Sequence, residues 1–206
     1  MACTLSLETE LWDDGYAWVA GVDEAGRGPL AGPVTTAVVI LPRDFEHAVL
    51  TDSKKLTPKV RERLYEELTA NEQIRWASDQ AGEREIDRIN ILKATHASMA
   101  RSVAKLSKVP DMVLIDGLDV PEFPFPQRGV VKGDSLSLSI AAASIIAKVE
   151  RDRLMLKMAE TYPGYGFDQH KRYPTKMHLE RLQESGPCPI HRQSFGPVSQ
   201  LTLKLD

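Results

Sequence analysis

Cysteine and long hydrophobic runs are both scarce in this chain. Its two cysteines in 206 residues, Cys3 and Cys188, lie far apart, and neither has a metal-type partner nearby. This pattern argues against a disulfide framework or a zinc site and is typical of a protein from the reducing cytoplasm. The longest apolar stretches, 36–41 and 140–147, are far too short to span a membrane. Because the N-terminus has neither a basic region nor a long apolar run, we expect no signal peptide and a cytoplasmic location.

A large net charge is missing too. The formal charge of −3 argues against a general nucleic-acid coat protein. The charges are unevenly placed, however: no lysine or arginine precedes Arg27, whereas residues 148–181 carry eight basic residues against five acidic ones. A local basic face of this kind can meet phosphates despite a negative total. On charge alone, a helix surface with internal ion pairs is the simpler interpretation.

Two hydrophobic periods alternate along the chain and predict a single α/β domain. The length and the 42% hydrophobic content suffice for one buried core. Strand-like patterns cover residues 17–22, 34–41, 74–81, 112–115 and 130–132. Helix-like patterns cover residues 58–70, 85–106, 138–160 and 175–185, and the tail beyond them is irregular. We therefore expect a mixed β-sheet flanked by helices.

Carboxylates stand at the ends of three of these strands. Asp23-Glu24, Asp116 and Asp134 each follow an apolar segment. Because functional sites in open α/β sheets form outside strand ends, we expect Asp23, Asp116 and Asp134 to meet. Glu24 points to the other side of a regular strand, and the glycine-rich turn after it could bend it back. Any one of these aspartates alone is more simply a turn former, but the repeated pattern favours a shared site.

Clustered carboxylates call for a cation, because like charges raise one another's pKa. Purely oxygen ligands select Mg²⁺ or Mn²⁺ rather than zinc. Two such ions can activate a water molecule and stabilise the leaving oxygen of a phosphodiester. The four acidic residues therefore predict a two-metal site for hydrolysis of nucleic acid.

The glycine-rich turn at Gly26-Arg27-Gly28 formally fits the dinucleotide-binding pattern GxGxx[GA]. That pattern requires a helix directly after the glycines, whereas here Pro29 leads toward the strand predicted at 34–41. We interpret the glycines as letting the backbone approach a ligand, with free N–H groups and Arg27 facing it. Such a backbone clamp suits a sugar hydroxyl or a phosphate. A plain tight turn would explain the glycines but not the adjacent carboxylates.

A series of short motifs runs through the chain in a fixed order. They are GVDEAGRGPLAG (21–32), DSKKL (52–56), IDG (115–117), VKGD (131–134), AAASIIAKV (141–149), YGF (165–167), HKxYPT (170–175) and HRxSFGP (191–197). With these motifs the sequence resembles the ribonuclease HII family over residues 21–198. The resemblance implies a ribonuclease H-like fold. Residues 1–206 would then form one catalytic domain, with a C-terminal, substrate-binding helical extension over residues 160–206.

The resemblance also implies an activity and its partners. Members of the family cut nucleic acid on the 5′ side of a ribonucleotide and leave a 3′-OH and a 5′-phosphate. Their substrates are RNA–DNA hybrids and duplex DNA that contains single ribonucleotides. We expect the same substrates here, and a monomer.

The family's site residues fall on matching positions of this chain. The ligands of two Mg²⁺ or Mn²⁺ ions fall on Asp23, Glu24, Asp116 and Asp134. The clamp that would read the 2′-OH falls on Gly26, Arg27 and Gly28. The family's tyrosine falls on Tyr173, which would stack on the sugar 3′ to the ribonucleotide and favour deoxyribose there. One departure lies beside it, since Arg172 occupies a position that is often glycine in the family.

Several other polar side chains are candidates for contacts with substrate phosphates. They are Ser53, Lys54, Lys55, Asn90, Lys132, Lys148, Arg151, Lys171, Arg172 and Thr175. Such contacts position a duplex without reading its sequence. The alternative for each basic residue is a solvated surface position, and Asn90 and Thr175 could equally cap helices. We expect His170 and His191 to be structural, because metal ions would supply the acid–base chemistry.

Three rival functions make different demands on the same residues. A metal nuclease of the same fold that acts on branched junctions or transposon ends would keep the carboxylates but would need neither the 26–28 clamp nor Tyr173. A non-enzymatic nucleic-acid binder would be expected to lack at least one carboxylate, and none is missing. A dinucleotide-dependent enzyme would need a helix where Pro29 stands.

Overall fold

The computed structural model describes residues 3–168 and 175–202. Within them the strands are β1 (Val19–Ala25), β2 (Val34–Ile40), β3 (Arg75–Ala81), β4 (Met112–Asp116) and β5 (Gln127–Val130). They form one sheet in the order β3-β2-β1-β4-β5. β2 runs antiparallel to both of its neighbours, whereas β4 runs parallel to β1 and to β5. The sheet is therefore mixed, which confirms the prediction.

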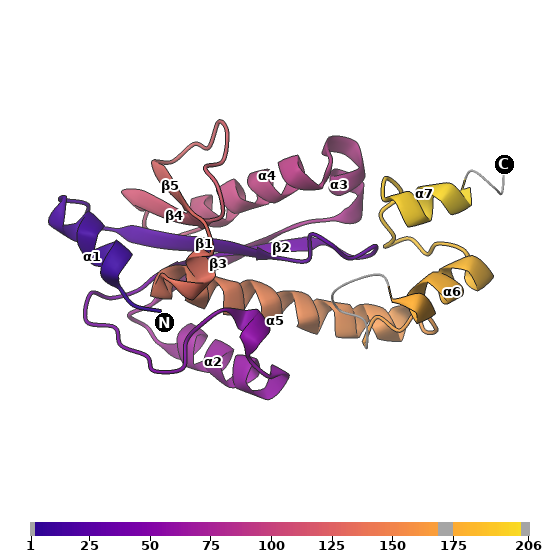
Figure 1. Ribbon diagram of the computed structural model, residues 1–206, viewed down its shortest axis with the longest axis horizontal. Helices are drawn as coiled ribbons and strands as arrows, with labels where there is room; N and C mark the ends of the chain where they lie inside the picture. The colour runs from indigo at the N-terminus through magenta and orange to yellow at the C-terminus, as the bar shows by residue number, and fades with distance from the viewer. Residues whose placement is uncertain (1–2, 169–174, 203–206) are drawn as a thin grey trace.

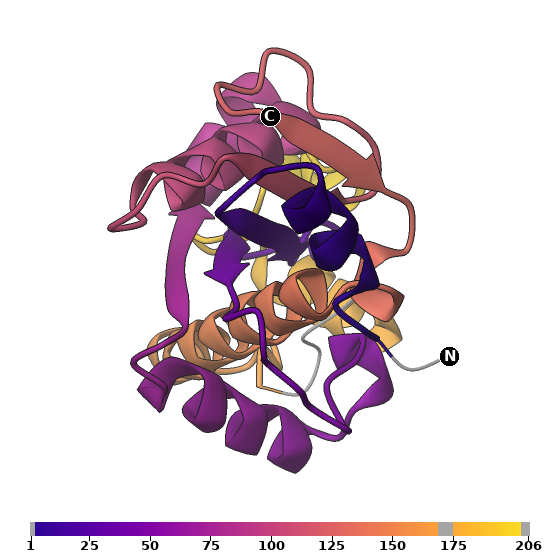
Figure 2. The same ribbon diagram turned by 90° about the vertical axis from the view of Figure 1, so that its left-hand side faces the viewer.

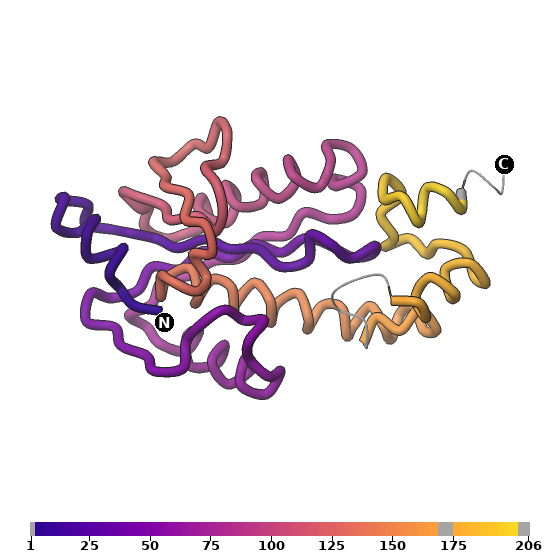
Figure 3. Tube along the Cα trace, viewed as in Figure 1, coloured from indigo at the N-terminus to yellow at the C-terminus, as the bar shows by residue number. Residues whose placement is uncertain are grey.

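Helices cover both faces of this sheet. They are α1 (Ser6–Asp13), α2 (Pro58–Ala70), α3 (Glu83–Ile89), α4 (Ile91–Ala104), α5 (Leu138–Thr161), α6 (Lys176–Ser185) and α7 (Gly196–Thr202), with short 3-10 turns η1 (Ser53–Lys55) and η2 (Gly133–Ser135). In Figure 1, α3 and α4 lie on one face and α5 on the other, with α2 outside α5. Figure 2 shows the same layers from the end that carries α1. α6 and α7 lie beyond the sheet, at the opposite end from α1 (Figure 3).

The close packing of α5 on β1 determines where the site lies. Gly21 in β1 makes it possible, because a Cβ there would lie 2.3 Å from the backbone nitrogen of Ile140. Ser137 caps α5 by accepting a hydrogen bond from the Ile140 N–H. The buried Glu8 of α1 in turn accepts from the Ser137 hydroxyl and the Ser139 N–H. The first turn of α5 is thereby held against β1.

The single helix predicted over residues 85–106 is wrong, because the structure divides it at Asn90. α3 ends at Ile89, and α4 begins at Ile91. Asn90 lies between them with φ of 68° and ψ of 163°, a backbone conformation that residues other than glycine rarely adopt. Its side chain accepts from the Lys93 N–H and so caps α4. The hydrophobic spacing alone does not reveal this break.

The strand predicted at 130–132 is present but lies earlier in the chain, at residues 127–130. β5 ends at Val130, Lys132 adopts a left-handed φ of 59°, and the chain then enters η2. Gly133 packs so tightly that a Cβ would lie 2.5 Å from the Ile140 side chain. Asp134 is therefore carried by a turn at the foot of α5 and not by the end of a strand. The tail, predicted to be irregular, forms α7.

The expected helix ends at three other places are confirmed. The Thr57 hydroxyl accepts from the Val60 N–H at the start of α2, and that of Thr175 accepts from the His178 N–H at the start of α6. Gly186, with φ of 70°, follows the last residue of α6. Among the described residues, no helix combines the length and the apolar character that crossing a membrane requires.

Candidate active site

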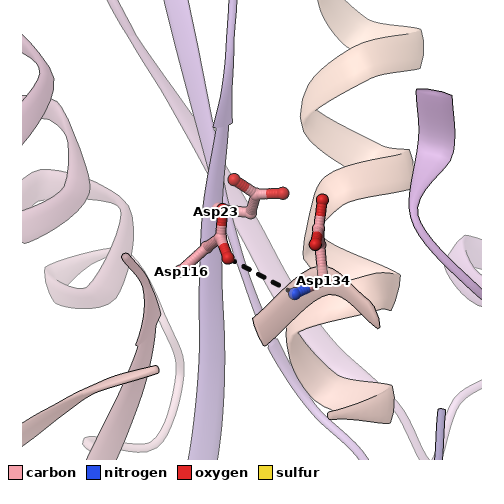
Figure 4. Close-up of side chains that lie close together, drawn as sticks. All are labelled: Asp23, Asp116 and Asp134. Atoms are coloured by element: carbon pink, nitrogen blue, oxygen red, sulfur yellow. Dashed lines mark hydrogen bonds between the residues drawn. The ribbon is translucent and has the colours of Figure 1, made fainter. Parts of the chain in front are cut away.

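Three aspartates from different parts of the chain meet beside the sheet (Figure 4). Asp23 lies in β1, Asp116 ends β4 and Asp134 lies in η2. One carboxylate oxygen of each lies within 4.8 Å of the other two. β1 and β4 are parallel neighbours with Val22 opposite Ile115, so the residues that follow this pair lie side by side. The Asp134 N–H donates to Asp116 Oδ1 at 3.4 Å, which ties η2 to β4.

The charges of these carboxylates are poorly compensated. Asp23 is 3% exposed and Asp134 is 5% exposed. Burial raises the pKa of Asp23 well above its usual range, and the charges of Glu24 and Asp116 raise it further. Burial also raises the pKa of Asp116, and Asp134 adds to the shift. A divalent cation would reverse this by favouring the charged forms, and the all-oxygen donor set suits Mg²⁺ or Mn²⁺.

Glu24 lies next to this group without joining it. The three aspartates form a group whose oxygens all approach one another. Glu24 is not in that group, but it lines a cleft of about 310 Å³ together with Asp23 and Asp116. Its Oε1 accepts from Arg27 Nη1 at 3.3 Å. Burial raises the pKa of Glu24, although the charge of Arg27 acts in the opposite direction. The Glu24 carboxylate thus lines the same cleft as Asp23 and Asp116 and is ion-paired with Arg27.

Lys54 of η1 supplies a positive charge at the mouth of the cluster. Its Nζ lies 3.3 Å from Asp134 Oδ2 and 4.0 Å from Asp52 Oδ1, and its side chain is 63% exposed. Burial lowers the pKa of Lys54, but the charges of Asp23 and Asp134 outweigh it, so the pKa is raised overall. The lysine predicted to contact phosphate is therefore an ion-pair partner of the carboxylates in this structure.

The Gly26-Arg27-Gly28 turn is supported from below by two buried arginines. Arg192 donates to the carbonyl oxygens of Gly26 at 2.6 Å, Arg27 at 2.9 Å and Gly32 at 2.9 Å. Arg151 of α5 donates to the carbonyls that follow, at residues 31 and 33. Gly26 has φ of +100°, and a Cβ there would lie 2.0 Å from Arg151 Nε. Only glycine fits this position.

Burial affects both arginines strongly. Arg151 is 1% exposed and Arg192 is fully buried. Burial lowers the pKa of Arg151 to about 10, and burial together with the charge of Arg151 lowers the pKa of Arg192 to about 9. Both guanidinium groups are therefore still charged at neutral pH. Arg151 is one of the residues that line the cleft, and its guanidinium donates to the carbonyls of residues 31 and 33, so its predicted phosphate contact stays a prediction.

Arg192 is the residue of this site that the sequence interpretation missed. It belongs to the HRxSFGP motif, but no local pattern links it to a turn that lies more than a hundred residues earlier. The backbone makes the link: the Arg192 N–H donates to the Leu30 carbonyl, and the Gly32 N–H donates to the Ile190 carbonyl. No role in the site was predicted for the HRxSFGP motif, and the arginine inside it is the signal that could have identified this residue.

Three further candidates lie in or beside the cleft. Ser53 lines it and hydrogen-bonds to the Ser144 hydroxyl at 2.8 Å. Lys148 also lines it and is ion-paired with Asp152 one helical turn later. Burial lowers the pKa of Lys148 to about 8, against the opposing effect of Asp152. Lys55 lies at the rim, where its ammonium donates to the Ser135 hydroxyl at 3.0 Å.

Other candidates lie elsewhere. Asn90 and Thr175 use their side-chain oxygens to cap α4 and α6, and neither lines the cleft. Lys132 is exposed beside η2. Four further candidates, Lys171, Tyr173, Arg172 and His170, fall outside the described residues.

Comparisons with known proteins agree on one family. The family model described as Ribonuclease HII matches residues 20–198. A Ribonuclease HII of Myxococcus xanthus is 50% identical over 196 residues, which cover 95% of this chain and 67% of that protein. One of Caldicellulosiruptor saccharolyticus is 49% identical over 189 residues, 92% of each. The crystal structure of ribonuclease H2 from Pyrococcus horikoshii is 26% identical with a TM-score of 0.74, over 91% of this chain and 98% of that one, which confirms the ribonuclease H-like fold.

Proposed function

The chain belongs to the ribonuclease HII family, and we propose that it cuts the phosphodiester bond on the 5′ side of ribonucleotides. Its substrates would be RNA–DNA hybrids and duplex DNA with single embedded ribonucleotides. The observation that carries this proposal is that Asp23, Glu24 and Asp116 line one cleft with the Gly26-Arg27-Gly28 turn, and that Asp134 meets two of these carboxylates. Chemistry at a phosphate and recognition of the neighbouring sugar can therefore take place together.

Asp23, Asp116, Asp134 and Glu24 would hold two Mg²⁺ or Mn²⁺ ions. Bound ions of this kind supply the charge that activates an attacking water and stabilises the departing 3′ oxygen. Support comes from the burial and mutual repulsion of the carboxylates, which make a cation favourable there. The chain's own contribution is to fix the oxygens from β1, β4 and η2 in advance.

Lys54 would exchange partners when substrate binds. Its ammonium now lies against Asp134, and neutralised carboxylates would leave it available for a phosphate of the duplex. Because its side chain is more than half exposed, this movement needs no rearrangement of the core. Ser53 and Lys148 line the same cleft and would contact the strand near the scissile phosphate. These contacts would position the duplex but carry no sequence information.

The Gly26-Arg27-Gly28 turn would distinguish RNA from DNA through the 2′-OH, the group by which a protein tells the two apart. Its backbone lines the cleft beside Asp23, so a sugar bound there lies next to the carboxylates. The stacking role of Tyr173, the substrate-binding extension from about residue 160, the monomeric state and the cytoplasmic location all stay predictions.

One assay tests the proposal. The protein is incubated with Mg²⁺ or Mn²⁺ and a DNA duplex that holds one ribonucleotide, beside an all-DNA duplex of the same sequence. We expect a single cut on the 5′ side of the ribonucleotide, with 3′-OH and 5′-phosphate ends and no cut in the control. Chelation of the metal should stop the reaction, and Asp134→Asn should abolish cutting while duplex binding persists.

Equal cutting of both duplexes would overturn the proposal. The same preparation offered a branched DNA junction would then test the alternative, a metal nuclease of this fold that acts on another DNA structure. Cutting by Asp134→Asn at the unaltered rate would remove that residue from the mechanism.

A further inference from the structure

The C-terminal segment reaches back across the fold to the turn at residues 26–28. Ala31 and His191 form an antiparallel bridge, flanked by backbone hydrogen bonds of 2.8 Å and 2.9 Å. The pairing of residues 30–32 with 190–192 gives Arg192 a fixed starting point. Its guanidinium lies 5.0 Å from the ring centroid of Phe195, at the start of α7. The backbone pairing and the Phe195 ring therefore both hold the Arg192 side chain in place.

All three nitrogens of this guanidinium donate to backbone carbonyls, two of them in the turn and one at Gly32. Nη2 bonds Gly26, Nη1 bonds Arg27 and Nε bonds Gly32. Burying a charge among carbonyl dipoles has a high desolvation cost. A protein with an apolar residue of similar volume at such a place is often as stable. What the fork of donors adds is a fixed orientation of the peptide planes it holds.

The planarity of the peptide bond transmits this orientation to the other side of the turn. In a trans peptide the carbonyl of one residue and the N–H of the next point in opposite directions. When Arg192 holds the carbonyls of Gly26 and Arg27, the N–H groups of Arg27 and Gly28 point away from it. Both residues line the cleft, and within residues 3–168 and 175–202 neither N–H has a backbone acceptor.

We propose that Arg192 is a positioning residue, which aims the amide N–H groups of Arg27 and Gly28 at the 2′-OH of the bound ribonucleotide. The inference rests on the proposed function and goes beyond it, because it assigns the selectivity for ribonucleotides to a buried side chain from the far end of the chain. Arg192 touches neither the substrate nor the carboxylates. It acts only through the two peptide planes.

The test is Arg192→Lys, which keeps the charge but replaces the planar fork with a single point donor. Two constants are measured with Mg²⁺: the KM for the duplex with one ribonucleotide and the Ki of the all-DNA duplex as competitor. Their ratio, Ki/KM, reports how much the 2′-OH adds to binding, and it does not depend on the fraction of folded enzyme. We expect it to fall about tenfold, about the contribution of one neutral hydrogen bond between an amide N–H and the 2′-OH.

The matched control is Arg101→Lys. Arg101 makes several hydrogen bonds to Asp79 and Glu85 on α4's side of the sheet, away from the turn, and its variant should keep the wild-type ratio. An unchanged ratio in Arg192→Lys would overturn the inference. If that variant does not fold, Phe195→Leu removes the ring beside the guanidinium and should lower the ratio in the same direction, and no change there would also overturn it.

Failure of the proposed function has a different signature. In that case the wild-type protein itself cuts both duplexes equally, or has a Ki/KM ratio of one. If the wild type is selective and Arg192→Lys is equally selective, only the positioning role of Arg192 is refuted.

Discussion

Residues 23–24 and residues 26–28 are adjacent in the chain, yet their polar groups are treated in opposite ways. In the acidic pair, Asp23 is buried and Glu24 is partly buried. Neighbouring carboxylates repel both, and two exposed cations, Lys54 and Arg27, supply the main compensation. In the turn after it, the buried Arg192 satisfies the carbonyls of Gly26 and Arg27, and the buried Arg151 bonds the carbonyls of residues 31 and 33. The region for chemistry is thus left unbalanced until a cation binds. The region for recognition is complete before substrate arrives.

The difference shows how one short segment can serve two purposes. Carboxylates that were fully paired inside the protein would bind metal ions weakly, because each ion would have to displace an internal partner. A turn that was loosely held would lose selectivity, since misplaced N–H groups cannot distinguish a hydroxyl from a hydrogen. Substitutions in the two regions should therefore fail in different ways.

The largest expected effect is that of Asp23→Asn. Asparagine keeps an oxygen for the Glu24 N–H, which Asp23 Oδ1 accepts at 2.6 Å, but it removes the buried charge. Cutting should fall by more than about a hundredfold, since loss of outer partners of metal ligands already reduces activity by up to that much. Without metal, this variant should melt at a higher temperature than the wild type, because the repulsion is relieved.

Kinetics at a single ribonucleotide and melting curves with and without Mg²⁺ check both parts. Asp111→Asn is the matched control, because Asp111 also accepts backbone N–H groups but near the start of β1. It should keep full activity. A lower melting temperature for metal-free Asp23→Asn would show that the acidic region is not unbalanced as described.

Gly26→Ala should damage the recognition region. A Cβ there would meet Arg151 and would also be strained by the positive φ, so we expect a loss of about 2 kcal/mol in the free energy of unfolding. Gly82→Ala is the control, since its Cβ would meet nothing within 4 Å at a negative φ, and it should change stability by less than about 0.5 kcal/mol. Denaturant unfolding measures both, and equal effects would contradict the packing argument.

Lowering the pH should affect the C-terminal support of the turn and the acidic residues in opposite ways. Burial and the neighbouring His178 lower the pKa of His191 to about 4. A group whose pKa is lowered by folding stabilises the folded protein at pH values above its pKa in the unfolded chain, about 6.5. This stability is lost as the pH falls through the pKa of the group in the folded protein. The C-terminal support should thus loosen between about pH 6.5 and 4. Over the same range, protonation relieves the repulsion at Asp23, whose raised pKa gives the opposite trend.

Hydrogen exchange of residues 186–198 at several pH values, followed by mass spectrometry, checks this expectation. His191→Gln should remove the acid dependence of exchange in that segment. Faster exchange at low pH in the variant as well as in the wild type would assign the effect to another group.

The smallest effect is expected from Lys54→Gln. Loss of one phosphate contact should weaken ribonucleotide and all-DNA duplexes equally, and it should reduce the salt dependence of binding by about one unit of slope. Lys108→Gln is the control, because Lys108 lies over Trp18 near the start of β1. A selective loss for the ribonucleotide duplex would place Lys54 in the recognition region instead.

Local sequence patterns were sufficient for much of the fold. Short apolar and β-branched runs located β1 to β4 to within a few residues, and Thr57, Thr175 and Gly186 marked helix ends. These features depend on neighbours within one or two turns of chain, so they can be read without a tertiary structure. The break at Asn90 was not predicted, because one polar residue does not interrupt the hydrophobic period of a helix.

The identity of the acidic residues, and the expectation that three of them would meet, also came from the sequence. What the tertiary structure decided is how they meet and what supports them. Asp134 arrives on a turn at the foot of α5, because Gly133 and Ile140 pack there. Arg192 reaches Gly26 because residues 190–192 pair with residues 30–32. Contacts between such distant segments leave no local pattern, since they arise only when the chain has packed.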